Sequence, residues 1–203
     1  MTLQQTDLDA LWDFADAVGS EARLRAAFDA ATDPVERREL RTQVARALGL
    51  QERFTEAHAV LDALDLDEPV VAVRVALERG RLHNSAGAPV EATWHFRRAA
   101  TLAEANGLTF LHIDALHMLA IADSEHADEH TETALRELAA IDDPRTLRWL
   151  VGLHNNRGWA RFDAGDKAGA LEAFEAAKDA AERYGTPQQR IWADEAIAEA
   201  RGS

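Results

Sequence analysis

The sequence predicts an all-α fold, and three observations carry that prediction: composition, the placement of proline and glycine, and an internal repeat. Alanine makes up about a fifth of the 203 residues, and leucine, glutamate and arginine supply much of the rest, all of which favour helices. No segment shows the alternation of apolar and polar residues that indicates a strand. The single β-branched run, residues 70–73, lies inside a helical stretch that ends near Ala86.

Proline and glycine predict where the helices begin and end. An acidic or hydroxyl side chain followed by proline is typical of a helix start, because the side chain caps the free backbone N–H groups and the proline takes the first position of the helix. Four such pairs occur: Asp33-Pro34, Glu68-Pro69, Asp143-Pro144 and Thr186-Pro187. The glycines read as ends or turns are Gly19, Gly49, Gly87, Gly107, Gly165 and Gly185. We expect about eleven helices of roughly 12–18 residues, joined by short turns that make neighbours antiparallel.

Two segments of the chain match each other at a constant offset. Superposing Arg79-Gly80 on Arg157-Gly158 aligns Gly87 with Gly165, Ala92 with Ala170, Phe96 with Phe174 and Ala99 with Ala177. Small residues at the first position let two helices approach closely, and the Ala, Phe and Ala make the buried stripe of the second helix. Weaker copies contain Ala45, Ala57 and Leu61, then Ala120, Ala134 and Leu138, and finally Trp12 and Phe28.

This pattern resembles the tetratricopeptide repeat, and its longer spacing resembles the longer-helix members of that family found in bacterial regulators. The resemblance implies a right-handed superhelical solenoid of about five antiparallel hairpins, stacked around one continuous core. We expect a single domain over residues 1–203, with hairpins at roughly 6–32, 33–65, 68–106, 108–141 and 143–185 and a capping helix at 186–201. One face of that last helix is predicted to contain Trp192, Ala193, Ala196, Ile197 and Ala200.

Charge and composition exclude several classes of function. With 36 acidic against 22 basic side chains the net charge is −14, which argues against nucleic acid, since phosphate binding depends on Lys and Arg. No cysteine is present, which removes thiolate nucleophiles, disulfides and cysteine-rich zinc sites. No apolar run is long enough for a membrane span, and the start of the sequence lacks the features of a signal peptide. We expect a cytoplasmic protein with no membrane partner.

No catalytic constellation is convincing. His126, Glu129 and His130 match the H-x-x-E-H signature of inverted zinc peptidases, but no third ligand accompanies them, so we interpret the segment as a solvated loop. His112 and His117 are five residues apart and point to different helix faces. The five tryptophans are expected mostly in the core. We therefore predict no enzyme, no metal and no cofactor; a zinc-dependent hydrolase is the remote alternative.

The resemblance implies a concave groove, lined by the first helix of each repeat, that binds extended peptides or a partner's helix. The positions that match are Thr42, Arg46, Arg74, Leu77, Arg81, Asn84, His117, Ile121, Asn155, Trp159 and Phe162. The arginines favour an acidic or C-terminal carboxylate peptide, and we expect them to be solvated in the free protein. Two alternatives stay open: the arginines pair with carboxylates of neighbouring repeats, or the chain is a self-assembling module that forms homo-oligomers.

Overall fold

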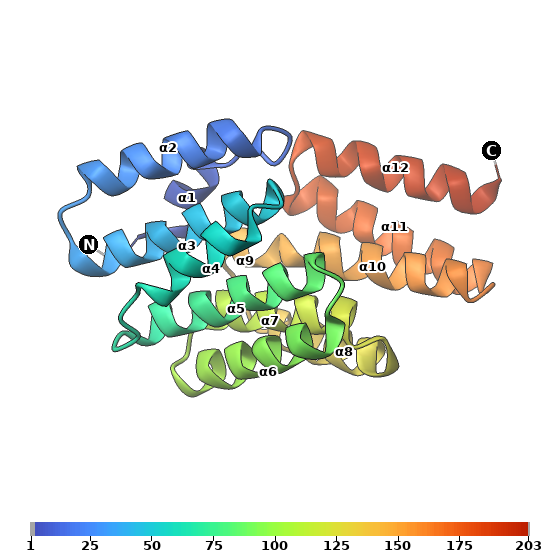
Figure 1. Ribbon diagram of the computed structural model, residues 1–203. Coiled ribbons are helices and arrows are strands. Elements are labelled where there is room, and N and C mark those ends of the chain that lie inside the picture. Colours follow the sequence, from blue (N-terminus) through green and yellow to red (C-terminus); the bar gives the residue numbers. More distant parts are fainter. Residues whose placement is uncertain (1–2, 203) are drawn as a thin grey trace. The chain divides into compact units, whose positions relative to one another are not determined.

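The computed structural model describes residues 3–202, and in that range all regular secondary structure is helical (Figure 1). The predicted all-α class is confirmed for these residues. They form twelve α-helices and one short 3-10 helix. None of the described helices is long and apolar enough to cross a membrane. The chain divides after Asp123 into two compact units, which are described separately.

The first unit contains seven helices, most of which pack on the next helix along the chain. They are α1 (Gln5–Leu11), α2 (Ala17–Ala30), α3 (Pro34–Leu50), α4 (Phe54–Asp62), α5 (Pro69–Ser85), α6 (Pro89–Ala105) and α7 (Thr109–Ala122). The closest pairs are α5 with α6 and α6 with α7, and α3 packs on both α2 and α5 (Figure 1). Short connections therefore give antiparallel neighbours, as expected.

The second unit begins with the 3-10 helix η1 (Ser124–His126). Its α-helices are α8 (Ala127–Leu138), α9 (Pro144–Leu147), α10 (Trp149–Asp163), α11 (Lys167–Tyr184) and α12 (Pro187–Arg201). Helix α11 packs closely on both α10 and α12. The expected hairpin 108–141 spans the division after Asp123, so its pairing, like the single domain 1–203, stays a prediction.

Most of the predicted helix boundaries are correct. The prolines of the four predicted starts all begin helices, and Asp33, Asp143 and Thr186 accept backbone N–H bonds as caps. Gly87, Gly107 and Gly165 follow the ends of helices and have positive φ angles. Residues with a Cβ atom rarely adopt this backbone conformation, which explains the glycine at each position.

Other boundaries were predicted wrongly. Gly19 lies inside α2 and Gly49 inside α3. Gly49 faces the Leu82 side chain, so close packing between helices, rather than a turn, explains the glycine there. Helices α1, α4 and α9 have only seven, nine and four residues, shorter than expected.

The close approach predicted from the internal repeat is confirmed in both copies. In the α5–α6 pair a Cβ placed on Gly80 would overlap the Phe96 ring, and in the α10–α11 pair a Cβ on Gly158 would overlap the Phe174 ring. Both phenylalanines are fully buried. The same glycine–phenylalanine contact therefore holds each of these helix pairs together.

Replacing Gly80 with Ala should destabilise the protein by about 1–3 kcal/mol, because the added methyl group overlaps a buried ring that has little room to move. Helix propensity alone predicts the opposite, a gain of up to about 1 kcal/mol for alanine over glycine inside a helix. Urea unfolding of the variant measures the sign. A stabilised Gly80→Ala protein would show that the helices are not in close contact at this position.

Helix α12 covers one side of α11, as expected of a cap. Ala196, Ile197 and Ala200 form a buried cluster with Ala170 and Phe174. The inclusion of Trp192 in the buried face was wrong, because its side chain is 57% exposed. It is adjacent in sequence to Ala193, and neighbouring residues on a helix point about 100° apart. The expectation of core tryptophans also fails at Trp94, which is equally exposed.

Two isoleucines on α12 provide a test of this packing. Ile197 is 8% exposed and Ile191 is 51% exposed. Ile197→Ala should cost about 2–4 kcal/mol of stability through the cavity it leaves, whereas Ile191→Ala should stay within about 0.5 kcal/mol of the parent. Thermal melts of the two variants make the comparison. Equal losses would contradict the burial of this face against α11.

Candidate functional site

Three of the predicted arginines meet on neighbouring helices of the first unit. Arg46 lies on α3, and Arg74 and Arg81 lie on α5, which packs against α3. The charge of Arg81 acts on Arg46, so the two guanidinium groups are close to each other. We call this surface of α3 and α5, with Arg46, Arg74 and Arg81, the arginine face.

Arg74 is paired inside the protein. Its Nε donates to Glu39 Oε2 at 2.8 Å, and the two side chains are only 9% and 1% exposed. Burial raises the pKa of Glu39, and the charge of Arg74 offsets part of that rise. Glu39 Oε1 is buried and has no hydrogen-bond partner, so the pair is held together by a single contact. This arginine therefore serves the core rather than a solvated surface.

Arg81 is paired twice. Nη1 donates to Glu78 Oε1 at 2.6 Å, and Nη2 donates to Asp114 of α7. Burial opposes the charge of Arg81, but Asp114 and Glu78 more than offset it and raise the pKa of Arg81 overall. In the same way, burial would raise the pKa of Asp114, while Arg81 and then Arg46 lower it.

The expectation that these arginines are solvated was wrong for Arg74 and Arg81, since the Arg81 side chain is also only 13% exposed. Pairing with neighbouring hairpins, the alternative kept open above, holds for both. The sequence separation between the two partners of each ion pair is a signal that sequence reasoning missed. Glu39 precedes Arg74 by 35 residues, and Asp114 follows Arg81 by 33. Each distance is about one repeat length, the offset at which stacked repeats bring side chains together.

Arg46 differs from the other two arginines. Among the described residues, no hydrogen bond or ion pair involves its guanidinium; its close neighbours are the rings of Trp12 and Phe14, at 5.5 and 5.2 Å from the central carbon. Burial, followed by the charge of Arg81, lowers the pKa of Arg46 to about 10. It is still a cation at neutral pH, and it is partly exposed to solvent.

The other predicted residues of the first unit lie in different surroundings. Thr42 is buried, and its hydroxyl donates to the Glu39 carbonyl at 2.6 Å. Leu77 is a core residue, whereas Ile121 is exposed and Asn84 is partly exposed. His117 lies near the ion pairs, and burial lowers its pKa to about 4, although Asp114 opposes that shift. Thr42 and Leu77 therefore do not line a solvated surface.

Three predicted residues, Asn155, Trp159 and Phe162, lie on α10 of the second unit. Trp159 meets Phe162 and the buried Phe174 edge to face, with ring centroids 5.7 and 5.0 Å away. Trp159 and Phe162 pack against the buried cluster that α11 and α12 share. These two aromatic side chains support the core of that unit, and Asn155 is partly exposed.

The N-terminal segment contributes a contact that sequence reasoning missed. Trp12 Nε1 donates to Gln43 Oε1 of α3 at 3.2 Å, and Arg74 Nη2 donates to Gln5 Oε1 at 3.4 Å. Leu8 is fully buried in the cluster that contains core residues of α3 and α5. The side chains of α1 and Trp12 therefore lie against the arginine face.

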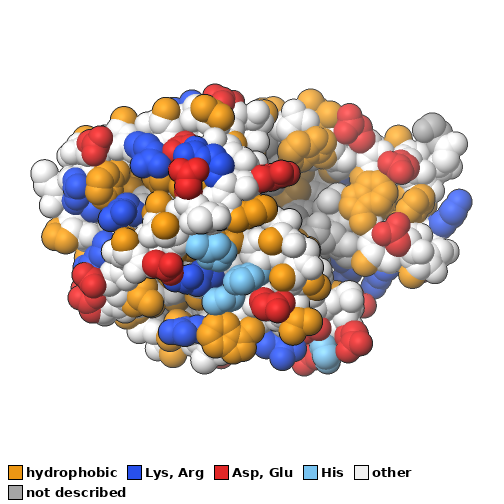
Figure 2. All heavy atoms as spheres, in the orientation of Figure 1, with side chains coloured by type: hydrophobic (Ala, Val, Ile, Leu, Met, Phe, Trp, Pro, Cys, Tyr) orange, Lys and Arg blue, Asp and Glu red, His pale blue; other side chains and the backbone are white. Residues whose placement is uncertain are grey.

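A group of three histidines from three helices is a second feature that the spacing along the chain did not indicate. The ring centroid of His83 on α5 lies 5.4 Å from that of His58 on α4 and 5.1 Å from that of His95 on α6. Histidine side chains gather on the face of the molecule seen in Figure 2. Burial, then His83 and Arg79, lowers the pKa of His95 to about 4; the same causes lower the pKa of His58. Among the described residues, no group of three or more metal-ligating side chains could hold a metal ion.

The lowered pKa makes His95 a source of acid sensitivity. In the unfolded chain His95 takes up a proton below about pH 6.5, whereas in the folded protein it does so only near pH 4. The contribution of His95 to the free energy of unfolding is therefore fully present above pH 6.5 and is lost as the pH falls from 6.5 toward 4. His95→Gln should reduce that loss by roughly 1–2 kcal/mol, allowing for solvent screening. Urea unfolding at pH 7 and pH 4.5 measures it. The control variant His126→Gln changes an exposed histidine outside the group, and between pH 7 and pH 4.5 it should lose as much stability as the parent.

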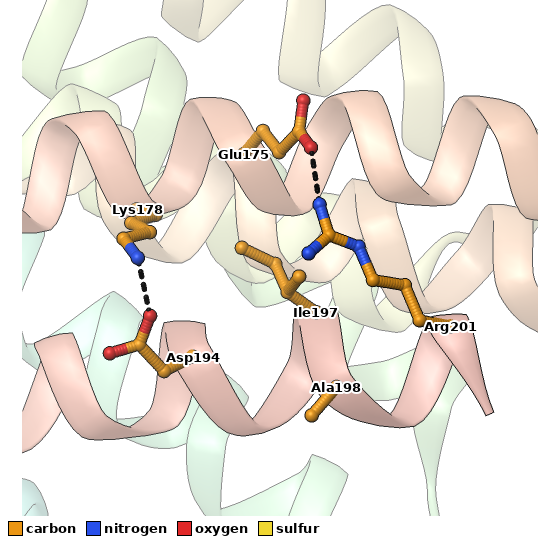
Figure 3. Close-up of a pocket in the computed structure, with 6 residues that line it drawn as sticks. All are labelled: Glu175, Lys178, Asp194, Ile197, Ala198 and Arg201. Atoms are coloured by element: carbon orange, nitrogen blue, oxygen red, sulfur yellow. Dashed lines mark hydrogen bonds and ion pairs between the residues drawn. The ribbon is translucent and has the colours of Figure 1, made fainter. Parts of the chain in front are cut away.

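A hollow of about 310 Å³ lies between α11 and α12 (Figure 3). Two ion pairs cross it: Lys178 with Asp194 at 2.6 Å, and Arg201 with Glu175 at 3.0 Å. Ile197 lies between the two pairs in the view. Because the four charges satisfy one another, the hollow presents no unpaired charge to a ligand.

The H-x-x-E-H motif lies at the start of α8. His126 precedes the helix, and residues 127–130 form its first turn, so the prediction of a loop was wrong, although His126 and Glu129 are exposed as expected. The imidazole rings of His126 and His130 are 6.3 Å apart.

Comparison with protein-family models, with characterised proteins and with solved structures finds no match to this chain. The tetratricopeptide resemblance therefore rests on the motif and on the helix packing described above.

Proposed function

We propose that this chain is a non-catalytic scaffold that binds a protein or peptide. In this proposal its hairpins form a right-handed tetratricopeptide-like solenoid, and the arginine face lines the groove that receives an acidic segment. The consecutive packing of helices within each unit and the repeated glycine–phenylalanine contact support the solenoid.

The observation that carries the proposal is the state of Arg46. A partly buried guanidinium without a carboxylate partner has unused hydrogen-bond donors in the free protein, and an incoming carboxylate would supply the missing partner. Arg74 and Arg81 already have partners, so their role is to hold α3, α5 and α7 in register beneath Arg46. In the free protein the Trp12 and Phe14 rings lie beside this guanidinium.

Arg46→Glu should weaken the binding of acidic peptides at least tenfold, because one charge-assisted hydrogen bond is lost and a like charge is introduced. Fluorescence anisotropy with labelled acidic peptides, carrying either a free or an amidated C-terminus, measures the loss and shows which carboxylate is recognised. Arg98 provides the matched control, since it is an exposed arginine over a tryptophan ring on α6 of the same unit.

The Arg98→Glu variant should bind like the parent. If acidic peptides bind the parent and Arg46→Glu equally, and raised salt changes neither, this assignment of the site fails. A groove dominated by ion pairing must lose affinity in salt.

Self-assembly is the second candidate, and exposed apolar side chains on α12 favour it. Ile191 and Trp192 are adjacent, and each is more than half exposed. A helix that caps one chain could pair with the same surface of a second copy. Light scattering separates the candidates, since a scaffold of the first kind is monomeric without its ligand.

A further inference from the structure

The segment that lies against the arginine face has an unusual composition. Residues 3–16 contain the four aspartates Asp7, Asp9, Asp13 and Asp16, no lysine or arginine, and the apolar side chains Leu3, Leu8, Leu11, Trp12 and Phe14. Its formal charge is therefore −4. The segment has the acidic and apolar character that the arginine face is expected to bind.

The contacts of this segment reach both helices of the arginine face. Trp12 bonds to Gln43 of α3, and Gln5 accepts a bond from Arg74 of α5. The stacked rings of Trp12 and Phe14, 5.0 Å apart, lie beside the guanidinium of Arg46. Aromatic side chains thus occupy the position next to the one arginine of this face that has no carboxylate partner.

The attachment of the segment to α3 and α5 is weak, whereas its hydrogen bonds of ordinary length go to α2, where Ser20 contacts Asp13 at 2.8 and 2.9 Å and Arg23 contacts the Leu11 carbonyl at 3.0 Å. Its two polar contacts to α3 and α5 are long, at 3.2 and 3.4 Å, and Phe14 is 62% exposed. Helix α1 has seven residues, far fewer than a helix needs to persist alone in water. Leu8 is the fully buried anchor. A competitor with the same chemistry and more contacts can therefore replace it.

From these contacts we infer that residues 3–16 are a built-in occupant of the arginine face, and that the partner is an acidic, aromatic, helix-forming segment of another protein that displaces them. The occupant covers the apolar part of the site while no partner is present and leaves Arg46 without a carboxylate. The partner gains by supplying that carboxylate. This inference rests on the proposed function and adds the chemistry of the partner and the means by which the site is kept closed.

The test is to weaken the occupant and offer the same chemistry from outside. The probe is a fluorescein-labelled synthetic peptide with the sequence of residues 3–16 in which Phe14, whose ring lies beside Arg46, is changed to glutamate, and its binding is followed by fluorescence anisotropy. Trp12→Ala removes the bond to Gln43 and the ring beside Arg46, and it should bind the probe at least tenfold more tightly than the parent. Trp192→Ala, at an exposed tryptophan of α12, should bind like the parent.

Two further comparisons show that charge drives the binding. A probe that keeps phenylalanine at position 14 should bind Trp12→Ala at least tenfold more weakly, because it brings no carboxylate to Arg46. The double variant Trp12→Ala with Arg46→Glu should lose a similar factor with the acidic probe. Equal binding in either comparison overturns the inference, because the partner would then not be selected by its acidic groups.

Displacement is also measured in the parent, which guards against a Trp12→Ala protein that folds poorly. With the 15N-labelled parent and an excess of unlabelled peptide, amide exchange of residues 5–14 should quicken at least several-fold. Phe14→Ala, at an exposed ring, should enhance probe binding in the same direction as Trp12→Ala. If the peptide binds and exchange of residues 5–14 does not change, the segment is a structural part of the unit and the inference is wrong.

The outcome also separates this inference from the proposed function. Should acidic peptides bind the parent through Arg46 while Trp12→Ala and Phe14→Ala bind no better, the binding function stands and the built-in occupant is rejected. If no acidic peptide binds the parent or either variant, both are rejected.

Discussion

The first unit depends on the burial of charged pairs between successive helices. Arg74 with Glu39 and Arg81 with Asp114 join α5 to the helices on either side of it. Removing one partner of such a pair typically costs about 3–5 kcal/mol, because the other charge is left buried and uncompensated. A shift of one helix turn along α5 would separate both pairs at once. The pairs thus fix the register of α3, α5 and α7, and a protein so constrained can present a fixed arrangement of side chains.

That constraint separates structural arginines from the functional candidate. Three guanidinium groups lie close together, and mutual repulsion would be severe if none were compensated. Glu39, Glu78 and Asp114 balance the three positive charges in number, but their close contacts go to Arg74 and Arg81. Glu78 and Asp114 act on Arg46 through their charge alone, without a hydrogen bond or ion pair. The local charge is nearly neutral while one hydrogen-bonding group stays unsatisfied, which favours a ligand that brings a carboxylate to that one point.

Much of this fold is predictable from spacing along the chain, and much of the site is not. Gly80 and Phe96 recur as Gly158 and Phe174 because close packing of two helices demands a small residue opposite a ring. Spacing also places Arg74 and Arg81 two turns apart on one helix. It does not tell which helix supplies the counter-charge, and so the paired arginines were expected in solvent. The histidine group and the seating of Trp12 come from separations with no fixed period, so only the three-dimensional structure shows them.

A tethered occupant changes what the site selects. A segment joined to α2 by a short connection competes as though it were present at millimolar concentration, so a free ligand that merely copies its contacts would rarely displace it. The ligand must add something that the segment lacks, and the carboxylate missing at Arg46 is the addition that the geometry offers. Long-range repulsion from a net charge of −14 is screened within about 8 Å at physiological salt, so it slows the approach of an acidic partner more than it weakens the bound state. Selectivity then resides in one short-range contact, and the closed state of the site excludes ligands that cannot make it.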